Sequence, residues 1–158
     1  MMEYKVGDTV IHCSHGMGEI IKMDEKFIHE RTMLCYVVRT HNLTVWVKAD
    51  EQGTSSIRPP TPDKDFEKLF DILCSPGEPL PAGWHERKIA LFERMKDGDL
   101  TSICHVIRDL TSYRRARKFN DSDKTILDKA ESLLITEWMF SRSVSWVEAR
   151  DELMRLLE

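Results

Sequence analysis

The hydrophobic pattern of the chain changes its period at a proline-rich stretch, Arg58-Pro59-Pro60-Thr61-Pro62. Before this stretch, apolar residues alternate or cluster in short runs, as in β-strands; after it they recur every three or four residues, as in helices. Prolines can extend neither a strand ladder nor the interior of a helix. We therefore predict an α+β protein with segregated strands and helices, in which residues 1–58 and 63–158 are domains and residues 59–62 are the linker.

Four short runs in the first domain are expected to form strands, because β-branched and apolar residues dominate them and turn residues separate them. These runs are residues 9–12, 19–23, 33–39 and 43–48. In the last run, Leu43, Val45 and Val47 share one face, and Trp46 lies on the other. Several short strands in so little chain favour a small closed β-barrel, because closure removes exposed strand edges.

The second domain is predicted to be an all-helical bundle of about five helices. Its expected caps are Thr61 with Pro62 at the first helical position, Asp99, Asn120 with Asp123, and Ser145 with Glu148. Apolar residues at helical spacing form its expected core: Phe66, Leu69, Phe70, Leu73, Leu91, Phe92, Met95, Leu100, Ile103, Val106, Ile107, Leu110, Ile126, Leu127, Ala130, Leu133, Leu134, Trp138, Trp146, Leu153, Leu156 and Leu157.

The charge of the helical domain is polarised along the sequence. Residues 84–118 carry nine basic and five acidic side chains, whereas residues 119–158 carry five basic and nine acidic ones. The densest basic run is Arg114-Arg115-Ala116-Arg117-Lys118. This run is equally consistent with a solvated helix end, where the helix dipole favours cations, and with a surface that contacts phosphates.

Trp84 lies in this basic part, directly after a Pro/Gly-rich stretch and at the expected start of a helix. An apolar side chain beside cations, here Arg87 and Lys88, is the combination that inserts between base steps from the minor groove. We therefore take Trp84, Arg87, Lys88, Arg114 and Arg115 as candidate DNA contacts. From the residues alone, packing of Trp84 in the core remains the favoured alternative.

Other classes of function find little support in the sequence. His12-Cys13-Ser14-His15 lacks a second Cys/His pair that could complete a zinc site, and we expect no bound metal and no cofactor. No phosphate-binding loop, nucleophile elbow or pair of catalytic carboxylates is visible, so we expect no enzyme activity. The four dispersed cysteines and the missing apolar leader and membrane-length run favour a cytoplasmic protein with no membrane contact.

Several ordered motifs resemble the CarD-like bacterial transcription regulators. In the first domain they are Lys5-Val6-Gly7-Asp8-Thr9-Val10, His15-Gly16-Met17-Gly18 and Leu43-Thr44-Val45-Trp46-Val47. In the second they are Pro81-Ala82-Gly83-Trp84-His85-Glu86-Arg87, Gly98-Asp99-Leu100 and Val106-Ile107-Arg108-Asp109-Leu110. The resemblance covers essentially the whole chain, and the set in its linear order is more specific than any single motif.

The resemblance implies that the first domain is a Tudor-like barrel that docks on the β subunit of RNA polymerase, partly by extending a sheet. Trp46 replaces a family arginine on the Leu43-Thr44-Val45-Trp46-Val47 strand, and Lys26 and Ile28 correspond to the other expected contact strand. Trp46 is equally consistent with a side chain that covers an exposed sheet face. The helical domain would contact promoter DNA, and Trp84 would enter the minor groove at the upstream bubble edge and stabilise the open complex.

Two positions depart from the family pattern. Glu86 places a negative charge where a phosphate contact is expected, and Ile89 replaces a usual cation. We therefore expect weak, largely sequence-independent binding to promoter DNA by a monomer that polymerase brings to the promoter. The alternative is a polymerase-binding interaction module without significant DNA contact.

Overall fold

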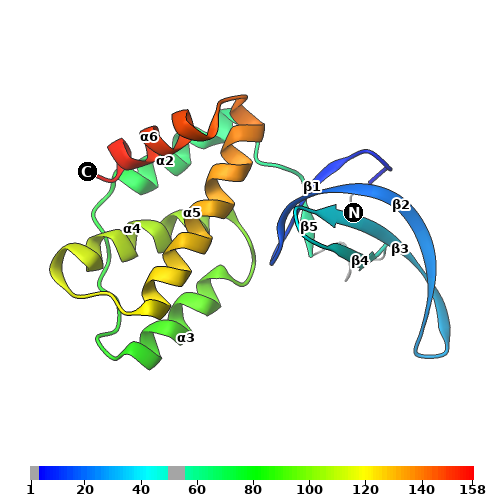
Figure 1. Ribbon diagram of the computed structural model, residues 1–158, viewed down its shortest axis with the longest axis horizontal. Coiled ribbons are helices and arrows are strands. Elements are labelled where there is room, and N and C mark those ends of the chain that lie inside the picture. The colour runs from blue at the N-terminus through cyan, green and yellow to red at the C-terminus, as the bar shows by residue number, and fades with distance from the viewer. Residues whose placement is uncertain (1–3, 50–55) are drawn as a thin grey trace. The chain divides into compact units, whose positions relative to one another are not determined.

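A computed structural model describes residues 4–49 and 56–158, and the chain divides into two compact units, Met1–Pro60 and Thr61–Glu158 (Figure 1). The described part of the first unit is a β-sheet and the second unit is helical, so the protein is α+β, as the change of period predicts. None of the helices in these residues combines the length and the apolar character that a bilayer crossing requires.

The sheet is antiparallel and has the strand order β4-β3-β2-β1-β5. Its strands are β1 (Thr9–His12), β2 (Gly16–Ile28), β3 (Arg31–Thr40), β4 (Thr44–Lys48) and β5 (Ile57–Arg58). The closed barrel expected from the sequence is wrong: β4 and β5 are the two edges, and no ladder joins them in the described residues. Within the described residues, β4 pairs with β3 alone, and β5 pairs with β1 over only two residues.

The longest part of the sheet is the β2–β3 hairpin, which extends further than the sequence pattern indicates. His29 and Glu30 connect the two strands, both with positive φ angles of 50° and 63°. Two left-handed residues in a two-residue loop suit the twist of a hairpin, although this conformation usually selects Asn or Gly. Because His29 and Glu30 are not typical turn residues, the sequence pattern ends the first strand too early, at residue 23, and begins the second too late, at residue 33.

One face of the sheet carries the core of the first unit. Its buried residues are Tyr4, Val10, Ile20, Tyr36, Val38, Val47 and Ile57. The alternation predicted for residues 43–48 is confirmed, because Val47 is buried in this core and Trp46 lies on the other face.

The second unit contains a short 3-10 helix, η1, and five α-helices, of which α5 is the longest. They are η1 (Asp63–Asp65), α2 (Phe66–Cys74), α3 (Trp84–Met95), α4 (Leu100–Ala116), α5 (Asp121–Arg142) and α6 (Trp146–Leu156). The strongest helix starts predicted from the sequence are confirmed as capping boxes, Asn120 with Asp123 and Ser145 with Glu148. Asp99 also caps α4 by accepting a hydrogen bond from the Thr101 N–H.

The predicted start of the first helix differs from the structure. Thr61 does not cap a helix; its N–H donates to a carboxylate oxygen of Glu137 at 2.8 Å. The first helical turn is η1, which begins after Pro62. A long-range contact to α5 therefore replaces the local cap that the sequence suggests.

The helical core forms largely as its periodicity predicts, with two aromatic exceptions. Leu91, Ile107, Leu134 and most other predicted positions are buried, and so is Trp138. Phe92 on α3 and Trp146 on α6 were expected in this core, but they are 55% and 51% exposed. Both lie on helices that the bundle covers on one side only, so their position around the helix rather than their hydrophobicity decides their exposure.

Candidate nucleic-acid interface

Trp84 is the first residue of α3, and its side chain is 60% exposed. The preceding Gly83 has an extended backbone, which turns the chain from the proline-rich segment into the helix. The Trp84 ring makes an edge contact with the ring of His85, its neighbour on the exposed turn. Trp84 is therefore not part of the core, and a large aromatic surface is open to solvent at the start of a helix.

Arg87 lies one turn below Trp84 and is buried, although the sequence suggests a phosphate contact. Its guanidinium forms a two-pronged ion pair with Asp123, with distances of 2.7 Å and 2.9 Å. It also donates to the backbone carbonyls of Pro81 and Ala82. With its donors directed into the protein, Arg87 is not available to a nucleic acid, and we remove it from the candidate DNA contacts.

The Arg87–Asp123 ion pair holds the first turn of α3, which carries Trp84. Hydrogen bonds to Asp123 raise the pKa of Arg87 against the lowering effect of burial. Burial alone would raise the pKa of Asp123, but hydrogen bonds from Arg87 and the Asn120 N–H outweigh it and hold that pKa below its usual value. Both groups are therefore charged at neutral pH, and the pair joins α3 to the N-terminus of α5.

Tyr113 connects the same arginine to α4. The Arg87 guanidinium lies 4.6 Å from the centre of the Tyr113 ring. Because Arg87 contacts α4 and α5 at once, the first turn of α3 has little freedom to move. Trp84 thus projects from a held turn, which lowers the entropy that a binding partner would have to remove.

Glu86 folds back over the start of α3. A Cβ built on Gly83 would lie only 2.1 Å from the Oε2 atom of Glu86, so this carboxylate occupies the space beside the Gly83 backbone. An acidic side chain is favoured here by the positive end of the helix dipole. Glu86 therefore serves the helix end, and it also reduces the attraction of this turn for phosphate.

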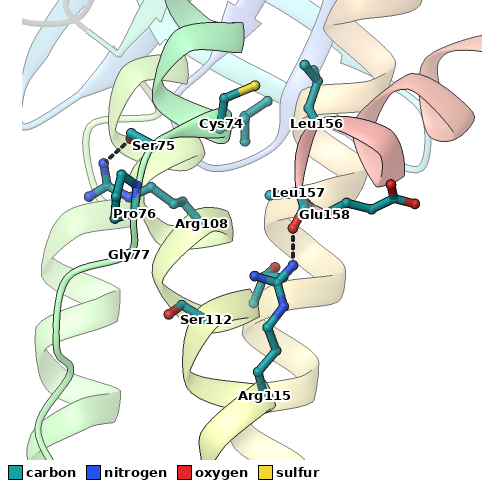
Figure 2. A pocket seen from close by; sticks show the side chains of 12 residues that line it. Cys74, Ser75, Pro76, Gly77, Arg108, Ser112, Arg115, Leu156, Leu157 and Glu158 are labelled. Atoms are coloured by element: carbon teal, nitrogen blue, oxygen red, sulfur yellow. Dashed lines mark hydrogen bonds between the residues drawn. The ribbon is translucent and has the colours of Figure 1, made fainter.

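The basic run at the end of α4 divides into two groups. Arg114 is exposed, with its guanidinium 5.5 Å from the Phe119 ring, and Arg117 and Lys118 are exposed beside it. Arg115 instead reaches across to α6 and donates to the backbone carbonyl of Leu157 (Figure 2). Arg115 therefore caps the C-terminal end of α6, where a cation is favoured.

Arg108, also on α4, has a similar role at the end of α2. Figure 2 shows its hydrogen bond to the hydroxyl of Ser75, the residue that directly follows α2. The bond is 2.8 Å long. Arg108 and Arg115 thus line one cavity of about 330 Å³ between the ends of α2 and α6. Both arginines bond to helix ends, Arg108 as a largely buried side chain and Arg115 as an exposed one.

The exposed cations and Trp84 lie at the same end of the helical unit. Ala82, two residues before Trp84, and Arg117 line a common pocket of about 250 Å³. Figure 1 shows the start of α3, the end of α4 and the start of α5 together at this end. Trp84, Arg114, Arg117 and Lys118 therefore form the part of the predicted DNA surface that the structure leaves open, and we call this set the wedge end.

Lys88 is half-buried on α3, with its Nζ atom 5.7 Å from the centre of the Phe92 ring. It remains a candidate contact one turn away from Trp84. Sequence reasoning missed the neighbouring Phe92, which it assigned to the core. The signal was nevertheless present as a four-residue spacing between Trp84, Lys88 and Phe92.

In the sheet unit, Lys26, Ile28 and Trp46 lie on the face opposite the core, as the register of β2, β3 and β4 requires. Trp46 is 38% exposed and contacts the ammonium groups of Lys26 at 5.0 Å and Lys22 at 5.7 Å. Its cross-strand neighbour Val37 is buried on the same face. Trp46 therefore both covers the sheet and presents aromatic surface between two lysines.

The His12–His15 segment forms a turn. The Nδ1 atom of His12 accepts hydrogen bonds from the backbone N–H groups of Ser14 and His15, and the two imidazole rings stack. Burial, followed by the nearby His15, lowers the pKa of His12. Among residues 4–49 and 56–158, no three His, Cys, Asp or Glu side chains are grouped so that they could hold a metal ion.

Comparisons with known proteins find similarity along both units. The family model described as "CarD, C-terminal domain" matches residues 68–154, which is more than half of the chain. The chain is also 28% identical over 136 residues to "Putative transcription factor YdeB" of Bacillus subtilis (strain 168), a match that covers 85% of this chain and 89% of that protein. The matched regions include α3 and Trp84.

Proposed function

The chain belongs to the CarD family, which gives it a role in transcription, and from this premise we propose that it holds promoter DNA open while bound to RNA polymerase. In this proposal it is not an enzyme: the sheet unit docks on the polymerase β subunit, and the helical unit inserts Trp84 into the minor groove at the upstream edge of the bubble. The observation that carries the proposal is the exposed Trp84 on a turn held by the buried Arg87–Asp123 pair.

The energetics favour a wedge that acts on DNA already distorted. Unstacking a base step costs a few kcal/mol, and an aromatic side chain in the gap recovers part of this cost. A held Trp84 loses little entropy on insertion, so most of its contact energy is available for the open state. A preference of about 1.4 kcal/mol for open DNA shifts the closed–open equilibrium about tenfold.

Electrostatics support recruitment by polymerase rather than by DNA. Of the five candidate DNA contacts, Arg87 is buried in its pair with Asp123, and Arg115 is exposed but donates to a backbone carbonyl. Glu86 lies at the start of the wedge helix. Arg114, Arg117, Lys118 and the half-buried Lys88 remain for phosphates. Because affinity for duplex DNA and its salt dependence scale with the number of phosphate contacts, few contacts imply weak, largely sequence-independent binding.

The small number of cations left for phosphates also favours one alternative, a polymerase-bound interaction module that makes no significant DNA contact. The two functions differ in what lies beside Trp84 in the open complex. A photoreactive amino acid at His85, which leaves Trp84 intact, should crosslink to promoter DNA at the upstream bubble edge. The matched control is the same probe at Val147, an exposed residue that follows Trp146 just as His85 follows Trp84. Crosslinks from residue 85 to protein alone would favour the interaction module.

Docking on polymerase is proposed to use the sheet unit, which we take to be Tudor-like. Among the strands that the structure describes, none pairs with the outer edge of β4, which suits strand addition, in which backbone hydrogen bonds supply affinity. Trp46 lies on this edge strand, beside Lys26 and on the same face as Ile28. An aromatic side chain between two cations suits a partner surface that combines an apolar pocket with acidic residues.

Replacing Trp46 with Ala should weaken binding to RNA polymerase by about 2 kcal/mol, or roughly 30-fold in Kd, because aromatic anchors dominate interface energies. Binding of purified chain to immobilised polymerase measures this change. Met23→Ala is the control, since Met23 is 39% exposed but lies on the opposite face of the same sheet. Equal affinities of the two variants would remove Trp46 from the docking site.

A further inference from the structure

The outer surface of α3 carries a row in which aromatic and cationic side chains alternate. Trp84, Lys88, Phe92 and Lys96 follow one another at intervals of four residues. The first three lie in α3, and Lys96, its C-cap, keeps helical backbone angles. Residues four apart are neighbours on a helix surface and rise by about 6 Å per step, so this α3 row is continuous and about 18 Å long.

Three members of the α3 row, Trp84, Phe92 and Lys96, are exposed, and Lys88 is half-buried. Phe92 is more than half exposed, as is Ile89 beside it. The Nζ atom of Lys88 lies against the Phe92 ring, and Lys96 contacts Glu93 at 3.6 Å with both side chains about three-quarters exposed. The exposed Lys96–Glu93 pair is worth little, so the Lys96 ammonium can exchange Glu93 for a phosphate. The cation–π contact of Lys88 at a partly exposed site is also weak.

The other cations of α3 are not available. Arg87 is buried against Asp123, and Arg94 donates to Asp109 at 2.8 Å. The accessible positive charge of this helix is therefore confined to Lys88 and Lys96, at the positions between and beyond the two aromatic rings. A DNA duplex exposes its phosphates, but its base faces are stacked inside and are not accessible to the Phe92 ring. A single strand offers both phosphates and open base faces.

We propose that the α3 row binds the unpaired DNA strand that leaves the bubble edge, with a base stacked on Phe92 and with phosphates at Lys88 and Lys96. This inference rests on the proposed function, because it begins where Trp84 enters the DNA. Every base has an aromatic face, so the contact tolerates any sequence. The α3 row thereby extends the contact from a single inserted side chain to a track along the melted strand.

The experiment compares three labelled DNA molecules, a duplex, the same duplex with an unpaired internal segment, and a single strand, by fluorescence anisotropy with the full chain. The native chain should bind the two DNAs with unpaired bases more tightly than the duplex. Phe92→Ala should lower that affinity about tenfold, the effect of losing one stacked base, and leave duplex binding unchanged. Phe140→Ala is the matched control, because Phe140 is 50% exposed on α5, away from the α3 row.

Three results would overturn the inference: no preference for unpaired DNA, no detectable binding of it, or equal affinity of the Phe92→Ala and native chains. If Phe92→Ala leaves DNA binding unchanged but weakens association with polymerase, the α3 row contacts a protein instead. None of these outcomes decides the role of Trp84. Trp84→Ala tests that role separately in open complexes. The role of Trp84 can therefore be correct when strand binding by the α3 row is wrong, and strand binding can be correct when the role of Trp84 is wrong.

Discussion

Replacing Arg87 with Ala is expected to lower the free energy of unfolding by about 3–5 kcal/mol, because it leaves the Asp123 carboxylate buried without its partner. The carbonyls of Pro81 and Ala82 lose a donor at the same time. A domain of ordinary stability has only about 5–15 kcal/mol, so the loss is a large fraction of the total. Urea unfolding followed by circular dichroism at neutral pH measures it.

The matched control for this prediction is Arg114→Ala. Arg114 also lies against an aromatic ring, that of Phe119, but it is exposed, whereas Arg87 is buried with its carboxylate partner. Its loss should change stability by less than about 1 kcal/mol. If both variants unfold at the same urea concentration, the buried ion pair does not hold the wedge turn, and Arg87 becomes available again as a phosphate contact.

The arginines show where sequence reasoning about the site reaches its limit. Arg87, Arg114 and Arg115 look alike as members of a basic segment, yet Arg87 is buried, Arg115 bonds to a backbone carbonyl while exposed, and Arg114 lies against an aromatic ring. The partner of Arg87 is Asp123, 36 residues away, and that of Arg115 is a carbonyl 42 residues away. Local charge cannot predict such pairing, because it depends on how the helix ends meet in three dimensions.

The fold was easier to predict, because its signals are local. The capping boxes that begin α5 and α6, at Asn120 and Ser145, are each formed by residues close together in the sequence. Alternation along the strand placed Val47 inside and Trp46 outside. The hairpin turn at His29 and Glu30 escaped prediction, since its left-handed backbone is held by the pairing of long strands and not by turn residues.

Exposed aromatic residues were the hardest to place. Phe92 and Trp146 fit helical periodicity as well as the buried Trp138 does, and hydrophobicity alone assigns all three to the core. Helix α3 buries Arg87 and Leu91 and turns Phe92 outward. A polar residue on the buried side of a helix and an aromatic residue on its open side are together the pattern expected where a fold serves binding.

Trp84→Ala is expected to shorten the lifetime of promoter open complexes about tenfold, the effect of losing about 1.4 kcal/mol of preferential contact with open DNA. Binding to polymerase should not change, because docking is proposed to use the sheet unit. The fold should not change either, since the Trp84 side chain is mostly exposed and the Arg87–Asp123 pair remains in place.

The control is Trp146→Ala. Trp146 is also the first residue of a helix and is exposed to a similar extent, but its neighbouring cation is Arg150 on α6, away from the wedge end. A change in open-complex lifetime common to both variants would indicate a general effect of losing an exposed tryptophan. A change restricted to Trp84→Ala would assign the effect to the wedge end.

The most direct test is therefore the dissociation rate of open complexes that polymerase forms on one promoter, measured after addition of a competitor with the native, Trp84→Ala and Trp146→Ala chains. We expect the native and Trp146→Ala chains to prolong the lifetime equally and Trp84→Ala to lose most of this effect while remaining bound to polymerase. Equal lifetimes for all three chains would contradict the assignment of Trp84 as the residue that holds the bubble open.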